Sequence, residues 1–263
     1  MGVRGVSGWF GHGDKPALFG CDTEPPGPLR GSRRGYGGPM TYVQRAADRF
    51  RGGDPAAGIE TWHAFSFSGF YDPDNVRFGP LAACNEERLA GGAGFAEHPH
   101  RDVEIVTWVI EGELTHEDST GRVVTVRPGD LQRLSAGSGV RHTERNAGSV
   151  PLRFVQMWLT PSEFGGEPSY EVVRGIADGT PYALRRAEAV LHVRRLRSGE
   201  CAGLPDAPWL YVHVVRGAVR LDSEVLRDGD AARILDASGV RVEAIGSAVE
   251  VLAWEMHAEP HFG

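Results

Sequence analysis

The hydrophobic pattern of this chain, from residue 61 onward, consists of short runs separated by turns. Val103–Ile110 is a continuous β-rich run, and Val123–Val126 and Leu131–Leu134 follow it, with glycine-, aspartate- and proline-containing turns between them. Strand-length runs with regular turns predict an antiparallel sandwich or barrel. Helical periodicity is weak nearly everywhere, and residues 181–190 are at best a short helix. We therefore predict a mostly β protein.

The same pattern of runs and turns occurs twice along the chain. Val109–Thr115 and Arg127–Leu134 in the first half resemble Val214–Arg220 and Arg227–Ile234 in the second half. The two turns lie 18 positions apart in the first copy and 13 apart in the second, so one hairpin of the second copy is shorter. Matching turns in matching order indicate a duplicated β-unit. We place the join within residues 161–190 and the two domains at residues 40–165 and 166–263.

Glycine and proline are unevenly distributed. Of 36 glycines in the 263 residues, 11 fall in residues 1–39, which also contain five prolines and show no hydrophobic period. A segment of this composition buries too little apolar surface to offset the entropy lost on ordering. We predict that residues 1–39 are a disordered leader. One hypothesis is that Met40, where the pattern begins, is the native translation start.

Charge and composition exclude several classes of protein. The net charge is −7, with +2 in the leader and −9 in the remaining 224 residues, which disfavours direct nucleic-acid binding. No apolar run approaches the roughly 20 residues that span a bilayer, and the N-terminus lacks a secretory pattern. Three widely spaced cysteines are typical of a chain without a disulfide framework. We expect a cytoplasmic monomer.

Two pairs of metal-ligand residue types lie in the first copy, His98 with His100 and His142 with Glu144. Residues two apart on a strand project from the same face, so each pair can direct both side chains at one point. Three neutral imidazoles and a carboxylate suit a first-row divalent ion and can leave a coordination position open for catalysis. A lone His-x-His is more often a chance surface pair. Two such pairs, each beside a glycine-rich turn of one β-unit, favour a metal site.

These motifs resemble those of a known family. Gly92, His98, His100 and Glu104, followed by the segment from Gly129 to Asn146, are similar to the two cupin motifs. More narrowly, the segments His98–Glu104, Ser135–Glu144 and Trp62–Phe67 resemble the pirin family. The resemblance extends from Met40 almost to the C-terminus, whereas residues 1–39 match nothing in it.

The resemblance implies an all-β bicupin, made of two tandem jelly-roll barrels with a metal in the N-terminal one. Pirins hold this metal through residues that correspond to His98, His100, His142 and Glu144. Thr143 and Arg145 differ from the residues usual in the pirin motif, but neither difference removes a metal-ligating side chain. We expect one divalent transition metal per chain, with Fe(II) the preferred ion and Mn, Ni, Cu or Zn also acceptable. Glu104 matches the general cupin glutamate, and we assign it a supporting or core role outside the ligand set.

The second copy lacks the corresponding donors. At the same offsets from its turns stand Gly203, Pro205, Val242 and Ala244. None of these side chains can ligate a metal, so we expect the C-terminal barrel to be metal-free. His213, the histidine nearest to the second-copy turn, is assigned to the core or surface.

Other candidates receive structural interpretations. His63 and His116 are read as hydrogen-bonding residues, and Cys84 and Cys201 as small hydrophobes without an activating partner. Strand aromatics can line a pocket over the metal or fill the barrel core, and the second is the commoner role. The candidates for either role are Phe65, Phe67, Phe95 and Trp108.

Two functional hypotheses follow from the resemblance. The preferred one is an enzyme, a metal-dependent dioxygenase that uses O₂ to open a flavonol such as quercetin, with Glu144 as the catalytic base. The alternative is a redox-sensing metal-binding protein that docks on a transcription-related or metabolic protein partner. One fold hosts many functions, so the fold alone does not decide between them.

Overall fold

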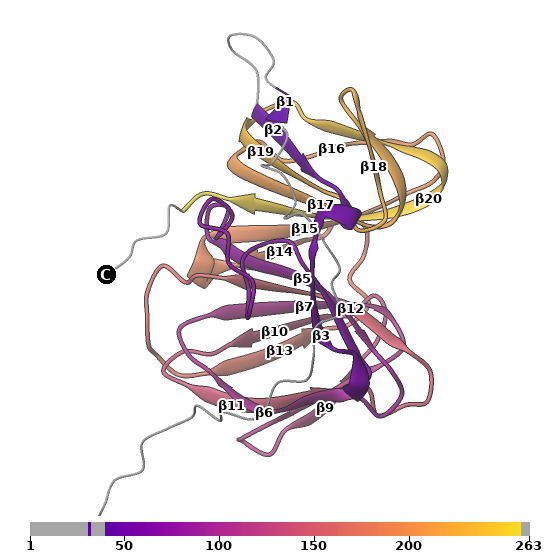
Figure 1. The fold of residues 1–263 in the computed structure, drawn as a ribbon. Coiled ribbons are helices and arrows are strands. Elements are labelled where there is room, and N and C mark those ends of the chain that lie inside the picture. Colours follow the sequence, from indigo (N-terminus) through magenta and orange to yellow (C-terminus); the bar gives the residue numbers. More distant parts are fainter. Residues whose placement is uncertain (1–30, 33–39, 259–263) are drawn as a thin grey trace, which may run out of the picture.

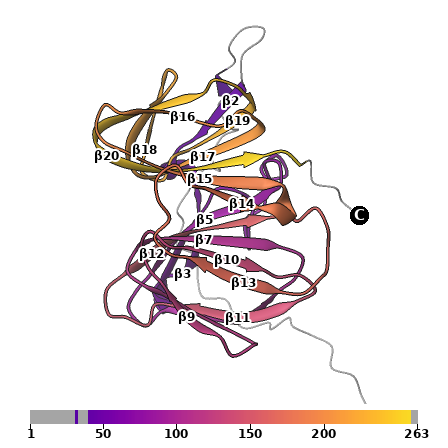
Figure 2. The same ribbon diagram turned by 180° about the vertical axis from the view of Figure 1, so that it is seen from behind.

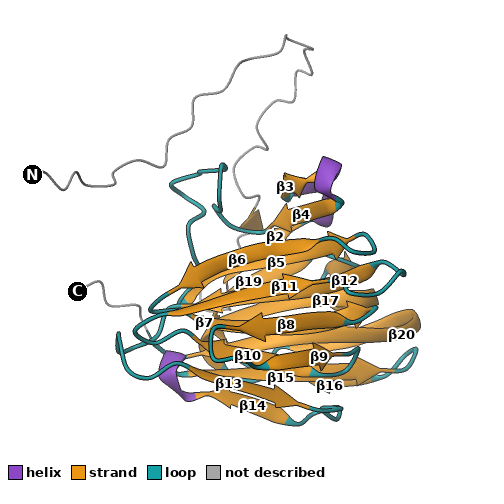
Figure 3. Cartoon of the chain, turned by 90° about the horizontal axis from the view of Figure 1, so that it is seen from below, coloured by secondary structure: helices purple, strands orange, loops and turns teal. Residues whose placement is uncertain are grey.

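The computed structural model describes residues 31–32 and 40–258, which form two stacked β-units (Figure 1). Strands are the dominant regular structure of this part of the chain, and its helices are single 3₁₀ turns: η1 (Ala46–Asp48), η2 (Pro55–Ala57) and η3 (Arg185–Ala187) (Figure 3). The all-β fold class is confirmed. No helix in the described ranges is long and apolar enough to cross a membrane.

The first unit contains two facing sheets. The larger has the strand order β13-β10-β7-β12-β5-β4-β3 and the smaller the order β6-β11-β8-β9, and every pair is antiparallel. The larger sheet is made of β3 (Phe50–Asp54), β4 (Ile59–His63), β5 (Leu81–Leu89), β7 (Glu104–Glu111), β10 (Leu131–Ser135), β12 (Leu152–Leu159) and β13 (Ser169–Val173). The smaller is made of β6 (Gly94–His100), β8 (Leu114–Asp118), β9 (Val123–Val126) and β11 (Val140–Arg145).

The second unit is one strongly bent sheet. Its main path runs β1-β2-β19-β17-β20-β15-β14, with β16 paired to β20 and β18 to β17. Its strands are β1 (Gly31–Ser32), β2 (Met40–Gln44), β14 (Pro181–Leu184), β15 (Ala189–Leu196), β16 (Cys201–Gly203), β17 (Ala207–Leu221), β18 (Glu224–Arg227), β19 (Ala231–Ala237) and β20 (Arg241–Met256). The pairing of the long strands β17 and β20 shifts register between Val214 and Arg216 and again between Arg216 and Ala218. These irregularities bend both strands, so that each contributes to both faces of the unit.

The two units share one hydrophobic core at their seam (Figure 2). Its largest cluster combines Trp108 of β7 with Leu191 of β15 and Trp254 of β20, all fully buried. The Trp254 Nε1–H group donates to Met157 Sδ across the seam at 3.0 Å. The stacked arrangement is therefore held by a continuous apolar interior rather than by the connecting segment alone.

The duplication inferred from the turns extends to their hydrogen bonds. Asp130 and Asp230 follow glycines with positive φ, Gly129 at 87° and Gly229 at 78°, as this turn requires. Each aspartate accepts from the backbone N–H three residues earlier, and from an arginine and the next backbone N–H directly after a neighbouring strand, β13 in the first unit and β2 in the second. The distances are 3.1 Å from Arg127, 2.6 Å from Arg174 and 3.0 Å from Gly175 in the first unit, and 3.0 Å from Arg227, 3.2 Å from Arg45 and 2.8 Å from Ala46 in the second.

The strands that precede these arginines, β13 and β2, each pair with a strand on the other side of the domain boundary expected from the sequence. β2 pairs with β19 of the second unit, although it precedes the first, and β13 pairs with β10 of the first unit although it lies beyond residue 165. A strand's partner is set by the free sheet edge that it reaches, which the linear pattern does not show. The division of the chain at residue 165 stays a proposal, with these two strands placed across it.

The structure also describes residues 181–190 and a small part of the predicted leader. Residues 181–190 are not a helix beyond the single turn η3, because β14 and β15 pair on either side of it. Of the predicted disordered leader, only Gly31–Ser32 are described, and they form β1 against β2. The rest of residues 1–39 lies outside the described residues.

Candidate metal centre

The candidate site is built on two neighbouring strands of the smaller sheet in the first unit. β6 carries His98 and His100, and β11 carries His142 and Glu144. His98 and His142 are direct cross-strand partners, so their side chains share one face of the sheet with His100. The register shifts between His142 and Glu144, a bulge that changes the aim of the glutamate relative to the histidine.

Three predicted ligands converge. One nitrogen from each of His98, His100 and His142 lies within 4.8 Å of the others, and the Nε2 atoms of His98 and His142 are 3.0 Å apart. His98 Nδ1–H donates to the Ala96 carbonyl at 2.8 Å, which leaves the lone pair of a neutral imidazole on Nε2. His100 Nε2 is buried and has no hydrogen-bond partner. These nitrogens face one another rather than protein acceptors.

The environment keeps His100 and His142 uncharged. Burial, together with the neighbouring imidazoles, lowers the pKa of His100 to about 4 and that of His142 to about 3. Both rings are therefore neutral near pH 7, the form that ligates a metal. An orphaned buried nitrogen amid converging lone pairs is an unfavourable arrangement for a protein interior, and a bound cation would satisfy it. The three histidines fit a first-row divalent ion.

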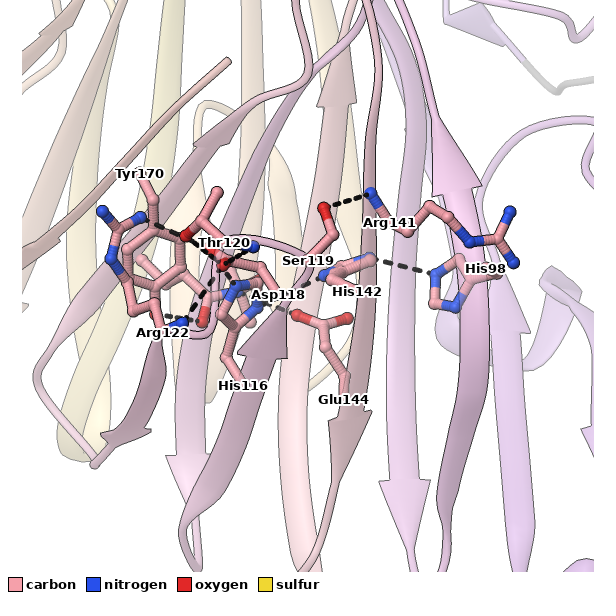
Figure 4. A network of polar contacts seen from close by, with 12 residues as sticks. His98, His116, Asp118, Ser119, Thr120, Arg122, Arg141, His142, Glu144 and Tyr170 are labelled. Carbon is pink, nitrogen blue, oxygen red and sulfur yellow. Dashed lines mark hydrogen bonds and ion pairs between the residues drawn. The ribbon is translucent and has the colours of Figure 1, made fainter.

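Glu144 lies in a second, overlapping group. It clusters with His142 and His116, outside the three-histidine group. Its two oxygens accept hydrogen bonds from Gln132 Nε2 at 2.8 Å and Gln156 Nε2 at 2.7 Å. The four predicted ligands are thus spread over two groups joined by His142, which lies between His98 and His116 in Figure 4.

Two further donors fix the glutamine amides. The Tyr170 hydroxyl donates to Gln132 Oε1 at 2.9 Å, and the Trp158 indole N–H donates to Gln156 Oε1 at 2.9 Å. Each amide oxygen therefore faces a donor, and each NH₂ group is directed at Glu144. The arrangement presents two donors to a buried carboxylate.

His116 belongs to the site more closely than the sequence suggested. It is fully buried, its Nδ1 is 3.3 Å from His142 Nδ1, and its ring stacks on Tyr170 with centroids 4.3 Å apart. Its Nε2 is 3.6 Å from Asp118 Oδ2. Burial alone would raise the pKa of Asp118, but hydrogen bonds from Thr120 and Arg122 lower it overall, so the carboxylate faces His116 ionised (Figure 4).

Glu104 and His63 lie apart from the three-histidine group. Glu104 is buried, accepts from Ser135 Oγ and lies 3.1 Å from Arg186 Nε. His63 Nδ1 is hydrogen-bonded to Asn85 Oδ1 at 2.9 Å. These contacts agree with the supporting roles expected for both residues.

The aromatic candidates separate into two sets. Phe67 lies edge-on to Trp158, which in turn lies edge-on to His100, with centroids 4.9 Å apart in each pair. Phe95 lies near His98, at 6.4 Å between centroids. Phe65 and Trp108 are instead fully buried in the core at the seam. The first set can line a pocket beside the histidines, and the second is core.

Sequence reasoning missed four residues that shape the site: Gln132, Gln156, Trp158 and Tyr170. A signal was available for Gln156, which interrupts the apolar stretch Phe154–Leu159, but not for Gln132, which stands beside Arg133 in a strand of mixed polarity. In the second unit, Val242 and Ala244 are buried in an apolar cluster, where the first unit has His142 and Glu144.

Comparison with known proteins identifies the relatives of this fold and site. The family model "Pirin" matches residues 43–159, and "Quercetinase C-terminal cupin domain" matches residues 187–256. A Mycobacterium tuberculosis protein named "Putative quercetin 2,3-dioxygenase" is 41% identical over 239 residues, covering 82% of this chain and 95% of that protein. The chain belongs to the pirin family. The predicted bicupin fold is confirmed by this membership.

Other pirin relatives carry more specific names. An Escherichia coli K12 protein named quercetin 2,3-dioxygenase is 41% identical over 133 residues, covering 50% of this chain and 57% of that protein. The crystal structure of the bacterial pirin YhhW from Escherichia coli in complex with nickel(II) has a TM-score of 0.76 and 30% identity, covering 84% of this chain and all of that one. Pirins therefore include a protein that binds a divalent metal.

Proposed function

We propose that this pirin is a metal-dependent dioxygenase that uses O₂ to open a flavonol such as quercetin. The observation that supports it best is the convergence of three imidazoles beside a buried carboxylate whose orientation is fixed. The names of the Mycobacterium and Escherichia coli relatives point to the same reaction. The proposal includes Fe(II) as the working ion and a cytoplasmic location.

The metal would be held by His98, His100 and His142, with Glu144 as the fourth donor implied by family resemblance. When bound, a divalent ion supplies Lewis acidity to the substrate oxygens and a place for O₂. His98 is the most exposed of the three histidines, whereas His100 and His142 are buried, so the open side of the centre lies toward His98.

The chain itself supplies a base and an orienting surface. Glu144 would accept the proton of the flavonol hydroxyl on a carboxylate oxygen, close to where the substrate binds. Gln132 and Gln156 each donate to one oxygen of this carboxylate, which fixes its orientation toward the histidines. Phe67 and Trp158 would pack against the aromatic rings and exclude water.

Oxygen uptake with a panel of flavonols tests the proposal. The metal-stripped protein would be reconstituted separately with Fe, Mn, Ni and Cu, and each form assayed against the stripped protein as control. We expect flavonol-dependent uptake with at least one ion and none without metal. Absence of uptake with every ion would contradict the enzyme and favour the alternative of a redox-responsive protein that docks on a partner.

A further inference from the structure

A cluster of polar side chains from both units meets at the seam, apart from the three-histidine group of the metal centre. Arg49 enters it from the segment between η1 and β3, Cys84 from β5, Tyr211 and His213 from β17, and Arg233 from β19. Tyr211 and Arg233 are direct cross-strand partners, and Tyr211 and His213 are two apart on one face of β17. Both arginines are only 5% exposed, and the other three residues are 1% exposed or less.

Neither guanidinium group forms an ion pair with a carboxylate of the described residues. In the part of the chain that the structure describes, no carboxylate lies within 4.0 Å of Arg49 or Arg233. Arg49 Nη2 donates to His213 Nδ1 at 2.9 Å, and Arg233 Nη2 donates to the Ala64 carbonyl at 2.9 Å. Glu86, on the same strand as Cys84, is paired with Arg153 at 2.8 Å. Glu86 acts on Arg49 and Asp72 on Arg233 only from beyond ion-pair distance, and the Arg233 guanidinium lies over the Phe65 ring, 4.1 Å from its centroid. Within hydrogen-bond distance both buried cations meet only neutral groups, an arrangement that is costly without an anion.

Unsatisfied donors around the two arginines outnumber the unsatisfied acceptors, which are Gln44 Oε1 and Asn75 Oδ1 beside the Ala64 carbonyl. The buried atoms without a hydrogen-bond partner include Arg49 Nε and Nη1, Arg233 Nε and His213 Nε2, whereas the Tyr211 hydroxyl faces the Cys84 thiol. Since His213 accepts from Arg49 at Nδ1, its neutral ring carries the hydrogen on Nε2 and offers a further donor. Several donors and two cationic groups without an acceptor of opposite charge make a site complementary to a negative ion.

We propose that the seam between the two units binds one small inorganic monoanion of halide size, held by Arg49 and Arg233. Complete enclosure of the cluster favours a small ion over a phosphate or an organic acid. Because Arg49 comes from the first unit and Arg233 from the second, the ion would join the units, and its removal would weaken their contact.

Cys84 is the internal group that could take the place of this anion. It is fully buried and interacts with both Arg49 and Tyr211. Burial raises the pKa of the Cys84 thiol despite the neighbouring guanidinium, which favours the neutral thiol at pH 7. A thiol leaves both positive charges unmatched, so an external ion is still needed.

Thermal unfolding in chloride-free buffer, titrated with bromide at constant ionic strength, tests the site. We expect the Tm of the full chain to rise saturably, by roughly 5–10 °C at a hundredfold excess over Kd. Arg233→Met should lose this response. The control is Arg220→Met. Arg220 is an exposed residue of β17, the strand that carries Tyr211, and it pairs with Glu243; its removal should leave the bromide response unchanged. Bromide-soaked crystals should show an anomalous peak at the seam between Arg49 and Arg233.

Three results would overturn the proposal. An equal bromide response in wild type and Arg233→Met would place the ion elsewhere. Water without an anomalous peak at the seam would show that no halide binds there. A wild type insensitive to bromide, combined with a bromide response gained in Cys84→Ser, would identify the Cys84 thiolate as the counter-ion. None of these results depends on whether the protein oxidises a flavonol.

Discussion

The two glutamines at the metal centre determine what the Glu144 carboxylate can do. Tyr170 and Trp158 fix the amides so that both NH₂ groups face Glu144. The spacing of His98, His100, His142 and Glu144 could be read from the sequence, because alternation along a strand places such pairs on one face. The glutamines could not be assigned, because their partners come from other strands and only the folded sheet brings them together.

Glu144→Gln tests the role of this carboxylate as a base. The variant loses the proton acceptor and places an amide NH₂ group against one of the two donating glutamines. We expect most of the metal to be retained through the three histidines, while flavonol turnover falls by about 10²-fold or more. Metal content and oxygen uptake measured on the same preparation give both quantities. Unchanged turnover with full metal content would rule out the role.

Glu87 on β5 is a second buried carboxyl near Glu144. Burial raises its pKa from 4.5 to about 8, and its contact in the structure is a hydrogen bond from Thr61 Oγ1. A carboxyl whose pKa is higher in the folded state binds its proton more tightly there. Stability should therefore fall as pH rises from about 5 to 8, by up to about 1.4 kcal/mol per pH unit.

Glu87→Gln should remove this pH dependence, because glutamine mimics the protonated acid. We expect the variant to be more stable than wild type above pH 7, with a difference that grows toward pH 8. Chemical unfolding at several pH values measures it, and Glu60→Gln, at an exposed position of the neighbouring strand, is the control. Parallel pH curves for wild type and Glu87→Gln would contradict the assignment.

At the scale of elements, each duplicated aspartate turn anchors the strand that pairs with the strand after the turn, β13 beside β10 in the first unit and β2 beside β19 in the second. The repeat was visible in the sequence as two matching turns. The sequence did not show that β2 joins the second unit and β13 the first, because the residues of a short strand do not determine which sheet edge it pairs with. The matching contacts of Arg174 with Asp130 and of Arg45 with Asp230 show that both strands fill the same place in their units.

Asp130→Asn should weaken the attachment of β13. Burial alone would raise the pKa of Asp130, but hydrogen bonds from Gly175, Arg174 and Arg127 lower it overall. Its contribution is therefore present above the unfolded value of 3.8 and is lost as pH falls through the folded pKa. We expect a loss of about 1.5 kcal/mol at pH 7, since Arg174 is half exposed.

The difference between wild type and Asp130→Asn should shrink as the pH falls below 3.8. Denaturant unfolding at pH 7 and at pH 3 measures it, with Asp74→Asn, at an exposed loop position without side-chain partners of its own, as the matched control. A loss of stability that is the same at both pH values would show that the charge of Asp130 is not what holds the strand.

At the scale of the whole molecule, the two units share one core and should unfold together. The largest hydrophobic cluster takes residues from both units, and β2 ties the start of the described chain to the second unit. We expect a single calorimetric transition whose calorimetric and van't Hoff enthalpies agree. Chelation should lower the Tm of this transition without splitting it. Two resolved transitions would mean that the seam does not couple the units.

The most direct test of the account is the metal content of the freshly purified chain. Three converging histidines in the first unit, and buried Val242 and Ala244 at the matching positions of the second, predict close to one divalent ion per chain. Elemental analysis of wild type beside the variant with His98, His100 and His142 all changed to alanine should give about one and about zero. Two tightly bound ions per chain, or undiminished metal in the triple variant, would contradict the assignment.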